Sequence, residues 1–570
     1  MMPWLPSILE TISIKKAIIL ITVIGSLVYF NSLSNGFVWD DHSQIIENER
    51  IHSIKNFFHF FSLSTFSTQA QEEAYYKPFL STTFSLLYTL FGQNSFVFHF
   101  PQILLHISNA ILVFLFFNFF FSRTKSFFSA LIFLIHPINT ESVSYISAMQ
   151  EVLFFLFGMG GLLLIQKNLR GIIPKIAISI LLLLSLLSKE SGLFFLLIAG
   201  VYVFIFLRRS FLHYLLISFV SLGIYLFLRL GIAGFYFTRF GDAPIQEASL
   251  IERLVSIPKI IFFYLKTFLL PFDLAISLDW VVHSINLSDF YLPLLFTSLF
   301  FSVLVGMGIF VWKKNRESTP IFVFFFLWFI LGLGLHLQIF PLDMTVAERW
   351  FYFPMVGLLG IVATVIQRVN IKNEKLKVSI LAILLVILAV FSLITIIRNF
   401  NWKDNMTLFS HDIKISRESP DLENNLGAEL YKVENYEKAE IHFQNSLKFN
   451  QNNSITWYNL GTVYDKKGDI VQAKESYKKS IEYGELDLAY AKLANLIYLN
   501  ETATETQKFT KSALVKQPNN AQLWLVLALV EYEMRNREQA LIAAQKAHEL
   551  SPTQDSVYIL KQIEQNLPIY

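Results

Sequence analysis

Hydrophobic residues are unevenly distributed along the chain. Long runs of Phe, Leu and Ile recur as far as Ile397, whereas the sequence from Asn399 onward is rich in Asn, Gln, Lys and Glu. A helix needs about 20 mostly apolar residues to cross the hydrocarbon of a bilayer, and segments of this kind predict about eleven spans. They lie at residues 14–33, 96–121, 127–145, 149–166, 172–187, 190–207, 211–231, 291–312, 319–340, 350–367 and 378–397.

Basic residues gather in every second connection between these segments. The connections contain Arg123/Lys125, Lys167/Arg170/Lys175, Arg208/Arg209, Lys313/Lys314/Arg316 and Arg368/Lys372/Lys375/Lys377. The positive-inside rule places such turns in the cytoplasm. The loops 34–95 and 232–290, and everything after Arg398, are therefore expected on the opposite, outer face.

One apolar segment does not fit this alternation. Ile251–Phe272 is apolar enough to span, but counting it would place the turn at Lys313 on the outer face. Because the segment contains Lys259 and Lys266, we expect an amphipathic helix that lies in the outer interface.

The C-terminal part repeats with the period of a helical hairpin. Small residues recur in Asn425-Leu-Gly427, Asn459-Leu-Gly461, Leu493-Ala494 and Leu527-Ala528, at steps of 34, 33 and 34. Ala439, Ala473, Thr506 and Ala540 stand twelve residues after each of them. This spacing is typical of tetratricopeptide (TPR) repeats, whose groove binds a peptide or protein. A rigid cap or a dimerisation element is the alternative.

The expected fold class is therefore all-α, with a polytopic helical membrane bundle followed by a TPR α-solenoid. The predicted boundaries are 1–398 for the membrane domain, with 34–95 as its first outer loop, 399–420 for a linker and 421–570 for the repeats.

Composition agrees with a membrane protein, since 54% of residues are hydrophobic, 16% are charged and the mean hydropathy is +0.49. With a net charge of +3 and no long Lys/Arg run, a nucleic-acid partner is not expected. Without cysteine, disulfides and thiolate chemistry are excluded.

Ionisable residues stand at span ends on the predicted outer face. Asp40 and Asp41 follow the first span, and two adjacent carboxylates raise each other's pKa, which suits one of them to accept a proton. The pair is also where a metal ion would bind, if one is used. The other members are His136, Glu141, Lys189, Glu190, Arg239, Glu348 and Arg349. Such a group indicates a site for an anionic, lipid-linked substrate, with Lys189, Arg239 and Arg349 as phosphate partners.

Several motifs carry a family resemblance over essentially the whole chain. They are NGFVWDDHSQIIEN, YYKPFLSTTFSLLYTLFG, HPINTESVSYIS, SKESG, AERWFYFP and NWKDNMTLF. In this order they resemble the GT-C class of membrane glycosyltransferases, in particular the transmembrane-and-TPR O-mannosyltransferases and their bacterial relatives. The resemblance implies a polyprenyl- or dolichyl-phosphate sugar donor, inverting transfer on the exoplasmic side, and a catalytic Asp in the first outer loop.

Carried onto this chain, the resemblance makes Asp40 or Asp41 the base that deprotonates an acceptor hydroxyl of a protein, glycan or lipid. Arg349, Lys189 and His136 would stabilise the departing phosphate, while Glu141 and Glu348 would orient them or bind the sugar. The sequence establishes no cofactor, and the need for a divalent cation, Mg²⁺ or Mn²⁺, is left open.

Two other functions fit part of the sequence. A flippase or transporter for a lipid-linked sugar would place polar groups through the midplane, whereas here they gather at one face. A non-catalytic scaffold would need only an anchor for the repeats. Residue usage rich in Phe, Ile, Lys and Asn suggests a bacterium, which predicts an inner-membrane protein with periplasmic repeats; in a eukaryote the repeats would be in the ER lumen.

Overall fold

The computed structural model describes residues 12–65, 75–236, 243–369 and 371–569. It divides into two compact units, Met1–Ser416 and Arg417–Tyr570. Within the described residues both units are helical, and β-pairing is limited to one isolated antiparallel bridge between Leu278 and Val346. The predicted all-α fold is confirmed.

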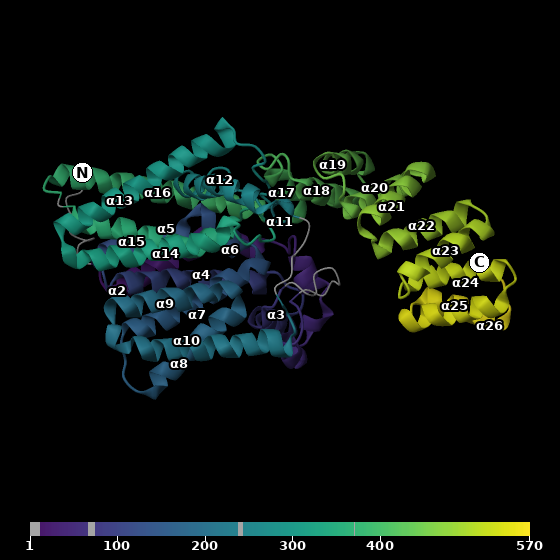
Figure 1. Cartoon of the computed structure of the whole chain (residues 1–570), viewed down its shortest axis with the longest axis horizontal. Coiled ribbons are helices and arrows are strands. Elements are labelled where there is room, and N and C mark those ends of the chain that lie inside the picture. Colours follow the sequence, from purple (N-terminus) through teal and green to yellow (C-terminus); the bar gives the residue numbers. More distant parts are fainter. Residues whose placement is uncertain (1–11, 66–74, 237–242, 370, 570) are drawn as a thin grey trace. The chain divides into compact units, whose positions relative to one another are not determined.

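Long helices of the first unit lie side by side along a common direction (Figure 1). Neighbours in the sequence pack on each other, as α7 does on α8 and α14 does on α15. The helices that match the predicted spans are α2 (Ile14–Val28), α4 (Phe96–Phe117), α5 (Arg123–Ile135), α7 (Met149–Gln166), α8 (Ile172–Ser188), α9 (Leu193–Phe206), α10 (Phe211–Leu226), α13 (Leu292–Lys314), α14 (Thr319–Gly334), α15 (Tyr352–Arg368) and α16 (Glu374–Asn401).

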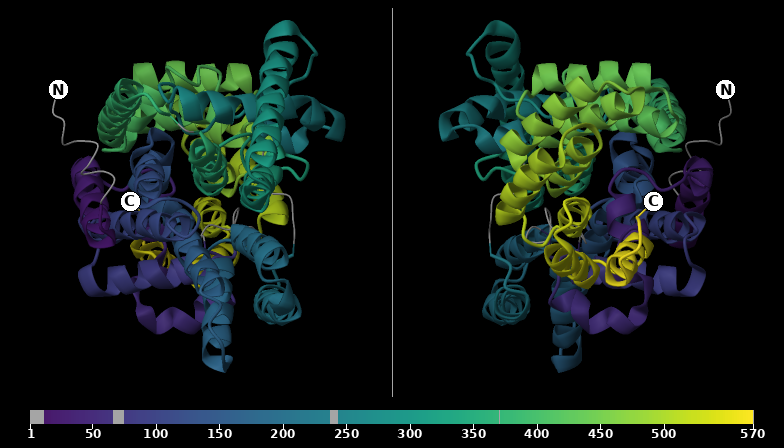
Figure 2. Two further views of the ribbon diagram at one scale, coloured as in Figure 1. Left: turned by 90° about the vertical axis from the view of Figure 1, so that its left-hand side faces the viewer. Right: turned by 90° about the vertical axis from the view of Figure 1, so that its right-hand side faces the viewer.

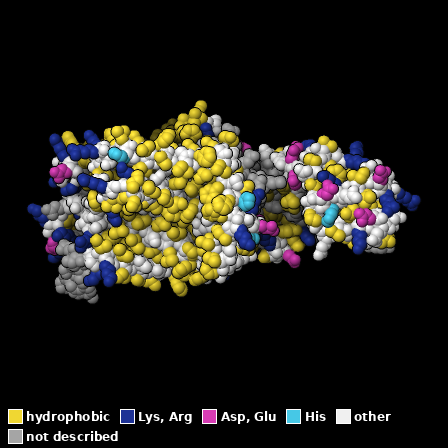
Figure 3. Space-filling model, turned by 90° about the horizontal axis from the view of Figure 1, so that it is seen from below, with side chains coloured by type: hydrophobic (Ala, Val, Ile, Leu, Met, Phe, Trp, Pro, Cys, Tyr) yellow, Lys and Arg dark blue, Asp and Glu magenta, His cyan; other side chains and the backbone are white. Residues whose placement is uncertain are grey.

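Much of the surface of this bundle is apolar, and Lys and Arg side chains cluster at one end of it (Figure 3). Among the described residues, 7 helical stretches are long and apolar enough to cross a membrane. They are Phe96–Phe117, Ile146–Gln166, Arg208–Ile232, Leu287–Lys314, Arg316–Leu337, Glu348–Arg368 and Glu374–Asn401. The predicted number of spans, about eleven, is therefore not confirmed, since α2, α5, α8 and α9 have 15, 13, 17 and 14 residues, fewer than the 21 to 28 residues of these stretches.

The expected span 127–145 is interrupted. Helix α5 ends at Ile135, because Pro137 disfavours helical backbone at the residue before it. The chain then forms three short pieces, η6 (Pro137–Asn139), α6 (Thr140–Ser144) and η7 (Ile146–Ala148). These pieces are buried, and they carry Glu141 and Tyr145 into the site described below.

The segments expected as outer loops are largely helical. Residues 34–95 contain the short helices η2 (His42–Ile46), η3 (Glu49–His52) and η4 (Ile54–Phe61), followed by the apolar helix α3 (Pro78–Phe91). The segment expected in the outer interface forms α12 (Leu250–Leu269), which begins with a capping box between Ser249 and Glu252. Because it contains several charged side chains, α12 is not among the seven apolar stretches that could cross a membrane. Its position in the interface stays a prediction.

The segment 399–420, for which a linker is expected, contains part of the first unit. Helix α16 continues to Asn401, and α17 (Asn405–Asp412) follows. Arg398 donates to both oxygens of Asp412 over 2.6 and 2.9 Å, and both side chains are buried. The backbone N–H of Ile276 also donates to Asp412 over 2.8 Å. These bonds attach α17 to the membrane unit.

The second unit is a succession of antiparallel helix hairpins that stack in chain order (Figures 1 and 2). Its helices are α18 (Pro420–Lys432), α19 (Tyr436–Phe449), α20 (Ser454–Lys467), α21 (Ile470–Gly484), α22 (Asp487–Asn500), α23 (Ala503–Lys516), α24 (Ala521–Glu533), α25 (Arg537–Leu550) and α26 (Gln554–Gln565). A Cβ at Gly427 or Gly461 would lie 2.8 or 2.7 Å from the ring of Phe443 or Tyr477. Close approach of paired helices therefore explains the recurring glycine.

Candidate functional site

Asp41 is held by three hydrogen bonds at the start of the first loop. One of its carboxylate oxygens accepts from the N–H and the hydroxyl of Ser147, over 2.7 and 2.6 Å. The other accepts from the N–H of Val38 over 3.0 Å. Asp41 is fully buried, and burial raises its pKa to about 7 although the hydrogen bonds oppose this shift. Both carboxylate oxygens of Asp41 therefore accept hydrogen bonds from within the protein. Through these bonds Asp41 joins the first loop to the segment that follows α6.

Asp40 has a different environment from its neighbour. The hydroxyl of Tyr145 donates to its Oδ2 over 2.8 Å, and within the described residues its Oδ1 has no hydrogen-bond partner. Partial burial raises the pKa of Asp40, while the bond from Tyr145 and the charge of Arg349 lower it. Of the two adjacent carboxylates, Asp40 is thus the one that can still accept a proton from another molecule.

Residues after α16 fix the backbone around Asp40. Trp39 stands before it with a φ of 53°, a left-handed conformation that is costly for a bulky residue. Its N–H donates to the side chain of Asn405 over 2.8 Å, and the N–H of Gly36 donates to the carbonyl of Lys403 over 2.9 Å. Tyr145 is stacked between the rings of Trp39 and Trp402. The segments NGFVWDDH and NWKDN are therefore hydrogen-bonded to each other and packed around Tyr145.

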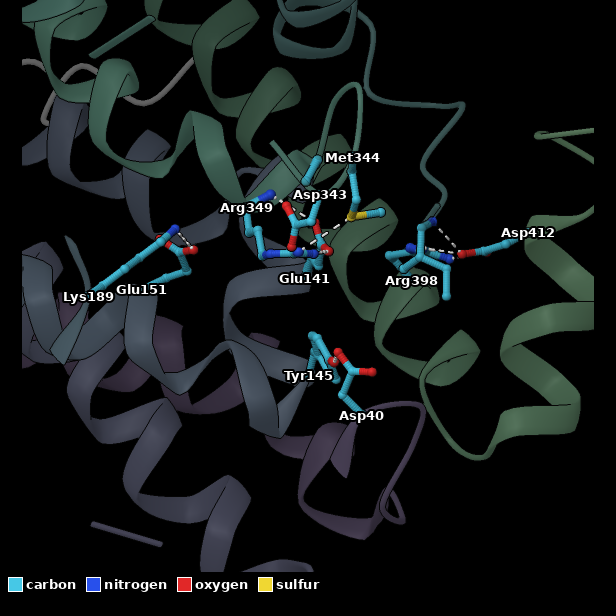
Figure 4. Close-up of polar contacts among 12 residues, drawn as sticks. Asp40, Glu141, Tyr145, Glu151, Lys189, Asp343, Met344, Arg349, Arg398 and Asp412 are labelled. Atoms are coloured by element: carbon cyan, nitrogen blue, oxygen red, sulfur yellow. Dashed lines mark hydrogen bonds and ion pairs between the residues drawn. The ribbon is translucent and has the colours of Figure 1, made fainter. Parts of the chain in front are cut away.

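Arg349 and Glu141 form a buried ion pair next to this loop (Figure 4). The backbone N–H of Arg349 also donates to the second oxygen of Glu141, over 2.8 Å. A second guanidinium nitrogen lies 3.5 Å from the sulfur of Met344. The sequence places these residues on the same face, and the structure brings them together as an interaction that fixes the direction of the guanidinium.

Lys189 and Glu190 have separate partners. Lys189 forms an ion pair with Glu151 at the start of α7, a residue that sequence reasoning missed (Figure 4). Glu190 accepts from Arg229 over 2.8 Å, and Arg229 donates to Tyr225 at the same distance. Although Lys189 and Glu190 are adjacent in the sequence, their side chains therefore pair with residues of different helices.

Lys77 is a second residue that the sequence analysis did not single out. It is buried, and among the described residues no carboxylate lies within ion-pair distance of its ammonium group, which sits 4.5 Å from the ring centre of Tyr75. Burial lowers its pKa to about 8, and the negative charges of Glu190, Asp343 and Glu151 oppose that shift. Its position in YYKPF, between aromatic residues and a proline, was the only available signal.

Asp343 also belongs to this region. Its carboxylate accepts from the hydroxyl of Tyr75 over 2.7 Å, and its charge acts on Asp40, Lys77 and Arg349. It stands four residues before the first residue of the AERWFYFP motif, which drew attention to Glu348 and Arg349 instead.

The remaining predicted residues contribute differently. His136 uses both ring nitrogens inside the protein: Nε2 lies 2.9 Å from the carbonyl of Phe268, and Nδ1 accepts from the N–H of Ile138. Burial lowers its pKa to about 4, so the expectation that His136 binds phosphate is not supported by this geometry. Glu348 is buried and forms no ion pair with Arg349 among the described residues. Arg239 lies outside the described residues.

A divalent cation lacks a ready set of ligands. In the part of the chain that the structure describes, no three His, Cys, Asp or Glu side chains come together as a metal site. The pair considered from the sequence, Asp40 and Asp41, does not fit a metal well because Asp41 accepts three hydrogen bonds from N–H and O–H donors.

Comparison with known proteins gives matches in both units. A tetratricopeptide repeat model matches residues 442–475. Protein O-mannosyl-transferase TMTC3 of Homo sapiens is 26% identical over 92% of this chain and 67% of its own length. Protein O-mannosyl-transferase F38B6.6 of Caenorhabditis elegans is 25% identical over 76% of this chain and 63% of its own length. Of solved structures, the TPR protein YrrB covers 27% of this chain and 81% of its own, at 18% identity and a TM-score of 0.24.

The chain spans about two thirds of the length of the curated relatives that it matches. The alignments include 92% and 95% of this chain for the TMTC3 proteins of Homo sapiens and Mus musculus. Over most of its length the chain is thus similar to proteins named protein O-mannosyl-transferases, and a tetratricopeptide repeat model matches within its C-terminal unit.

Proposed function

We propose that this protein is a membrane glycosyltransferase that moves a mannose or related hexose from a polyprenyl-phosphate donor to a hydroxyl of an acceptor protein. The names of the homologues support sugar transfer to protein, and the apolar helices support a lipid-linked donor. The observation that carries the proposal is the half-buried Asp40, which has one oxygen bound to Tyr145 and the other available to a substrate.

In the proposed reaction Asp40 accepts the proton of the acceptor hydroxyl. The hydroxyl oxygen attacks C1 of the sugar from the side opposite the phosphate, so that the new C–O bond forms as the bond from C1 to the phosphate oxygen breaks. The anomeric configuration is inverted, and the lipid phosphate leaves with the electron pair of the broken bond. Burial favours this role, because a carboxylate with a raised pKa is a stronger base.

Three cations are available for the developing phosphate charge. Lys189 and Arg349 are each paired with a glutamate, which positions them but also offsets part of their charge. Lys77 has no such partner among the described residues and is the principal phosphate ligand in this proposal. A charged donor to a phosphate is worth about 1.5–3 kcal/mol, so its loss should weaken donor use strongly.

Orientation and partners follow from the same proposal. The cluster of Lys and Arg at one end of the bundle (Figure 3) supports a cytoplasmic position for that end. The site and the repeats would then face the periplasm of a bacterium or the lumen of the ER. The repeats would bind the acceptor protein or another partner, as TPR grooves do.

The test is transfer of radiolabelled mannose from polyprenyl-phosphate mannose to endogenous proteins, using membranes that contain the full-length chain. Label is expected in protein, in the anomeric configuration opposite to that of the donor. Movement of intact donor across the membrane without label in any acceptor would favour a flippase. Absence of both activities with several sugar donors would favour a scaffold.

A further inference from the structure

A shallow groove lies at the basic end of the bundle, far along the sequence from the loop of Asp40. It has a volume of about 400 Å³ and forms where α9 and α13 end and α14 begins. Its lining residues are Ile205, Arg208, Trp312, Arg316, Thr319, Pro320 and Val323. We propose that this groove binds the headgroup of an anionic phospholipid.

Two arginines supply the positive charge. The guanidinium of Arg208 lies 5.5 Å from the ring of Phe204, and its Nε donates to the carbonyl of that residue over 3.3 Å. Arg316 lies 5.5 Å from the ring of Trp312. Within the described residues neither arginine forms an ion pair, so their terminal nitrogens are available as donors. Planar guanidinium groups held against aromatic rings are well suited to phosphate oxygens.

The start of α14 adds a polar group to the lining of the groove. The hydroxyl of Thr319 is buried and has no hydrogen-bond partner in the described part of the chain. Thr319 begins the 16-residue helix α14, and Thr319, Pro320 and Val323 at the start of that helix line the groove. An unpaired hydroxyl and a helix N-terminus both favour an anion.

Apolar side chains adjoin the charged groups and distinguish a lipid from a free anion. Trp312 is 48% exposed and Val323 is 40% exposed, and both line the groove. Phe204, one turn before Arg208, is 55% exposed. A phosphate bound by the arginines would have this apolar surface beside it, where acyl chains can lie. Basic pockets between helices at a membrane surface bind such headgroups, and Trp is enriched at this depth.

The test is native mass spectrometry of the full-length protein released from detergent after exposure to phosphatidylglycerol or phosphatidylcholine. Wild type should retain phosphatidylglycerol in preference to phosphatidylcholine. The double variant Arg208→Gln/Arg316→Gln should bind phosphatidylglycerol about tenfold more weakly or worse, because both phosphate donors are removed. An excess of inorganic phosphate should not displace the lipid, because phosphate has no acyl chain to contact the apolar side chains beside the arginines.

The matched control is Arg209→Gln/Lys313→Gln, which removes the same charge from exposed positions next to the groove. It should retain phosphatidylglycerol as wild type does. Equal loss in the control and the groove variant would show diffuse attraction to a basic surface and overturn the proposal. Unchanged binding in the groove variant would overturn it as well, and displacement by inorganic phosphate would show an anion site that does not recognise lipid.

Discussion

The hydroxyl of Tyr145 donates a hydrogen bond of 2.8 Å to Oδ2 of Asp40, across 105 residues of sequence. The bond distinguishes the two adjacent carboxylates. Asp41 is enclosed by N–H and O–H donors from Val38 and Ser147, whereas Asp40 keeps one oxygen for an incoming hydroxyl. The predictions below follow from this asymmetry and from the cations around it.

Removing the hydroxyl of Tyr145 should change the acidic side of the pH profile. The bond stabilises ionised Asp40 and so lowers its pKa against the effect of burial. In Tyr145→Phe the pKa of Asp40 should rise, and the acidic limb of kcat/KM should move to higher pH. Activity should return toward the wild-type value once the pH exceeds the new pKa. A loss that is equal at every pH would instead point to a purely structural role for Tyr145.

Replacing Lys77 should impair donor use. Lys77→Met should lower kcat/KM for the polyprenyl-phosphate sugar by about 10- to 100-fold, the equivalent of one charged hydrogen bond. The effect should be smaller for Lys55→Met, which removes an exposed lysine of the same loop. A Lys77→Met enzyme with wild-type kcat/KM would remove Lys77 from the proposed site.

Deprotonation of Lys77 should also determine the pH at which kcat/KM falls on the alkaline side of the pH profile. Its pKa is lowered to about 8, so the ammonium is charged below that pH and is lost as pH rises through it. In the free enzyme kcat/KM should therefore fall above about pH 8. Lys77→Arg, whose side chain stays charged, should move this limb to higher pH. An alkaline limb that is unchanged in Lys77→Arg would assign it to another group.

The buried pair of Arg398 and Asp412 should be important for stability. Asp412→Asn leaves the guanidinium of Arg398 buried without its counter-charge, which costs about 3–5 kcal/mol in comparable pairs. Thermal unfolding of the membrane unit in detergent should shift clearly downward. Asp273→Asn, which breaks the exposed pair with Lys266, should have little effect, since surface pairs contribute about 0–1 kcal/mol. Equal shifts in the two variants would contradict this account of α17.

The repeats and most of the helices could be predicted because their signals are local. The period of 33 to 34 residues reports close packing of neighbouring helices, as at Gly427 and Gly461. The break after Ile135 was missed when 127–145 was counted as one span, although Pro137 and the polar residues that follow it were visible signals. Helix lengths, and with them the number of spans, depend on such local backbone constraints as well as on apolar content.

The proximity of several candidate residues was predicted, whereas their roles stay predictions. Motifs at span ends identified Asp40, Asp41, Glu141, Lys189 and Arg349, and the structure brings these residues into one region. What the sequence could not supply was the partner of each side chain. Ser147 binds Asp41, Glu151 pairs with Lys189, and within the described ranges no carboxylate pairs with Lys77. Each of these facts depends on residues from different helices, so no local pattern reports it.

The most direct test of the central claim compares Asp40→Asn with Asp41→Asn and Asp273→Asn in the mannose-transfer assay, at equal amounts of folded protein. We expect Asp40→Asn to lower kcat by about 10²- to 10⁴-fold, the usual contribution of a general base, without loss of thermal stability. Asp41→Asn should reduce stability as well as activity, because it disturbs bonds to Val38 and Ser147, and Asp273→Asn should do neither. An Asp40→Asn enzyme that keeps wild-type kcat would contradict the claim that Asp40 is the base.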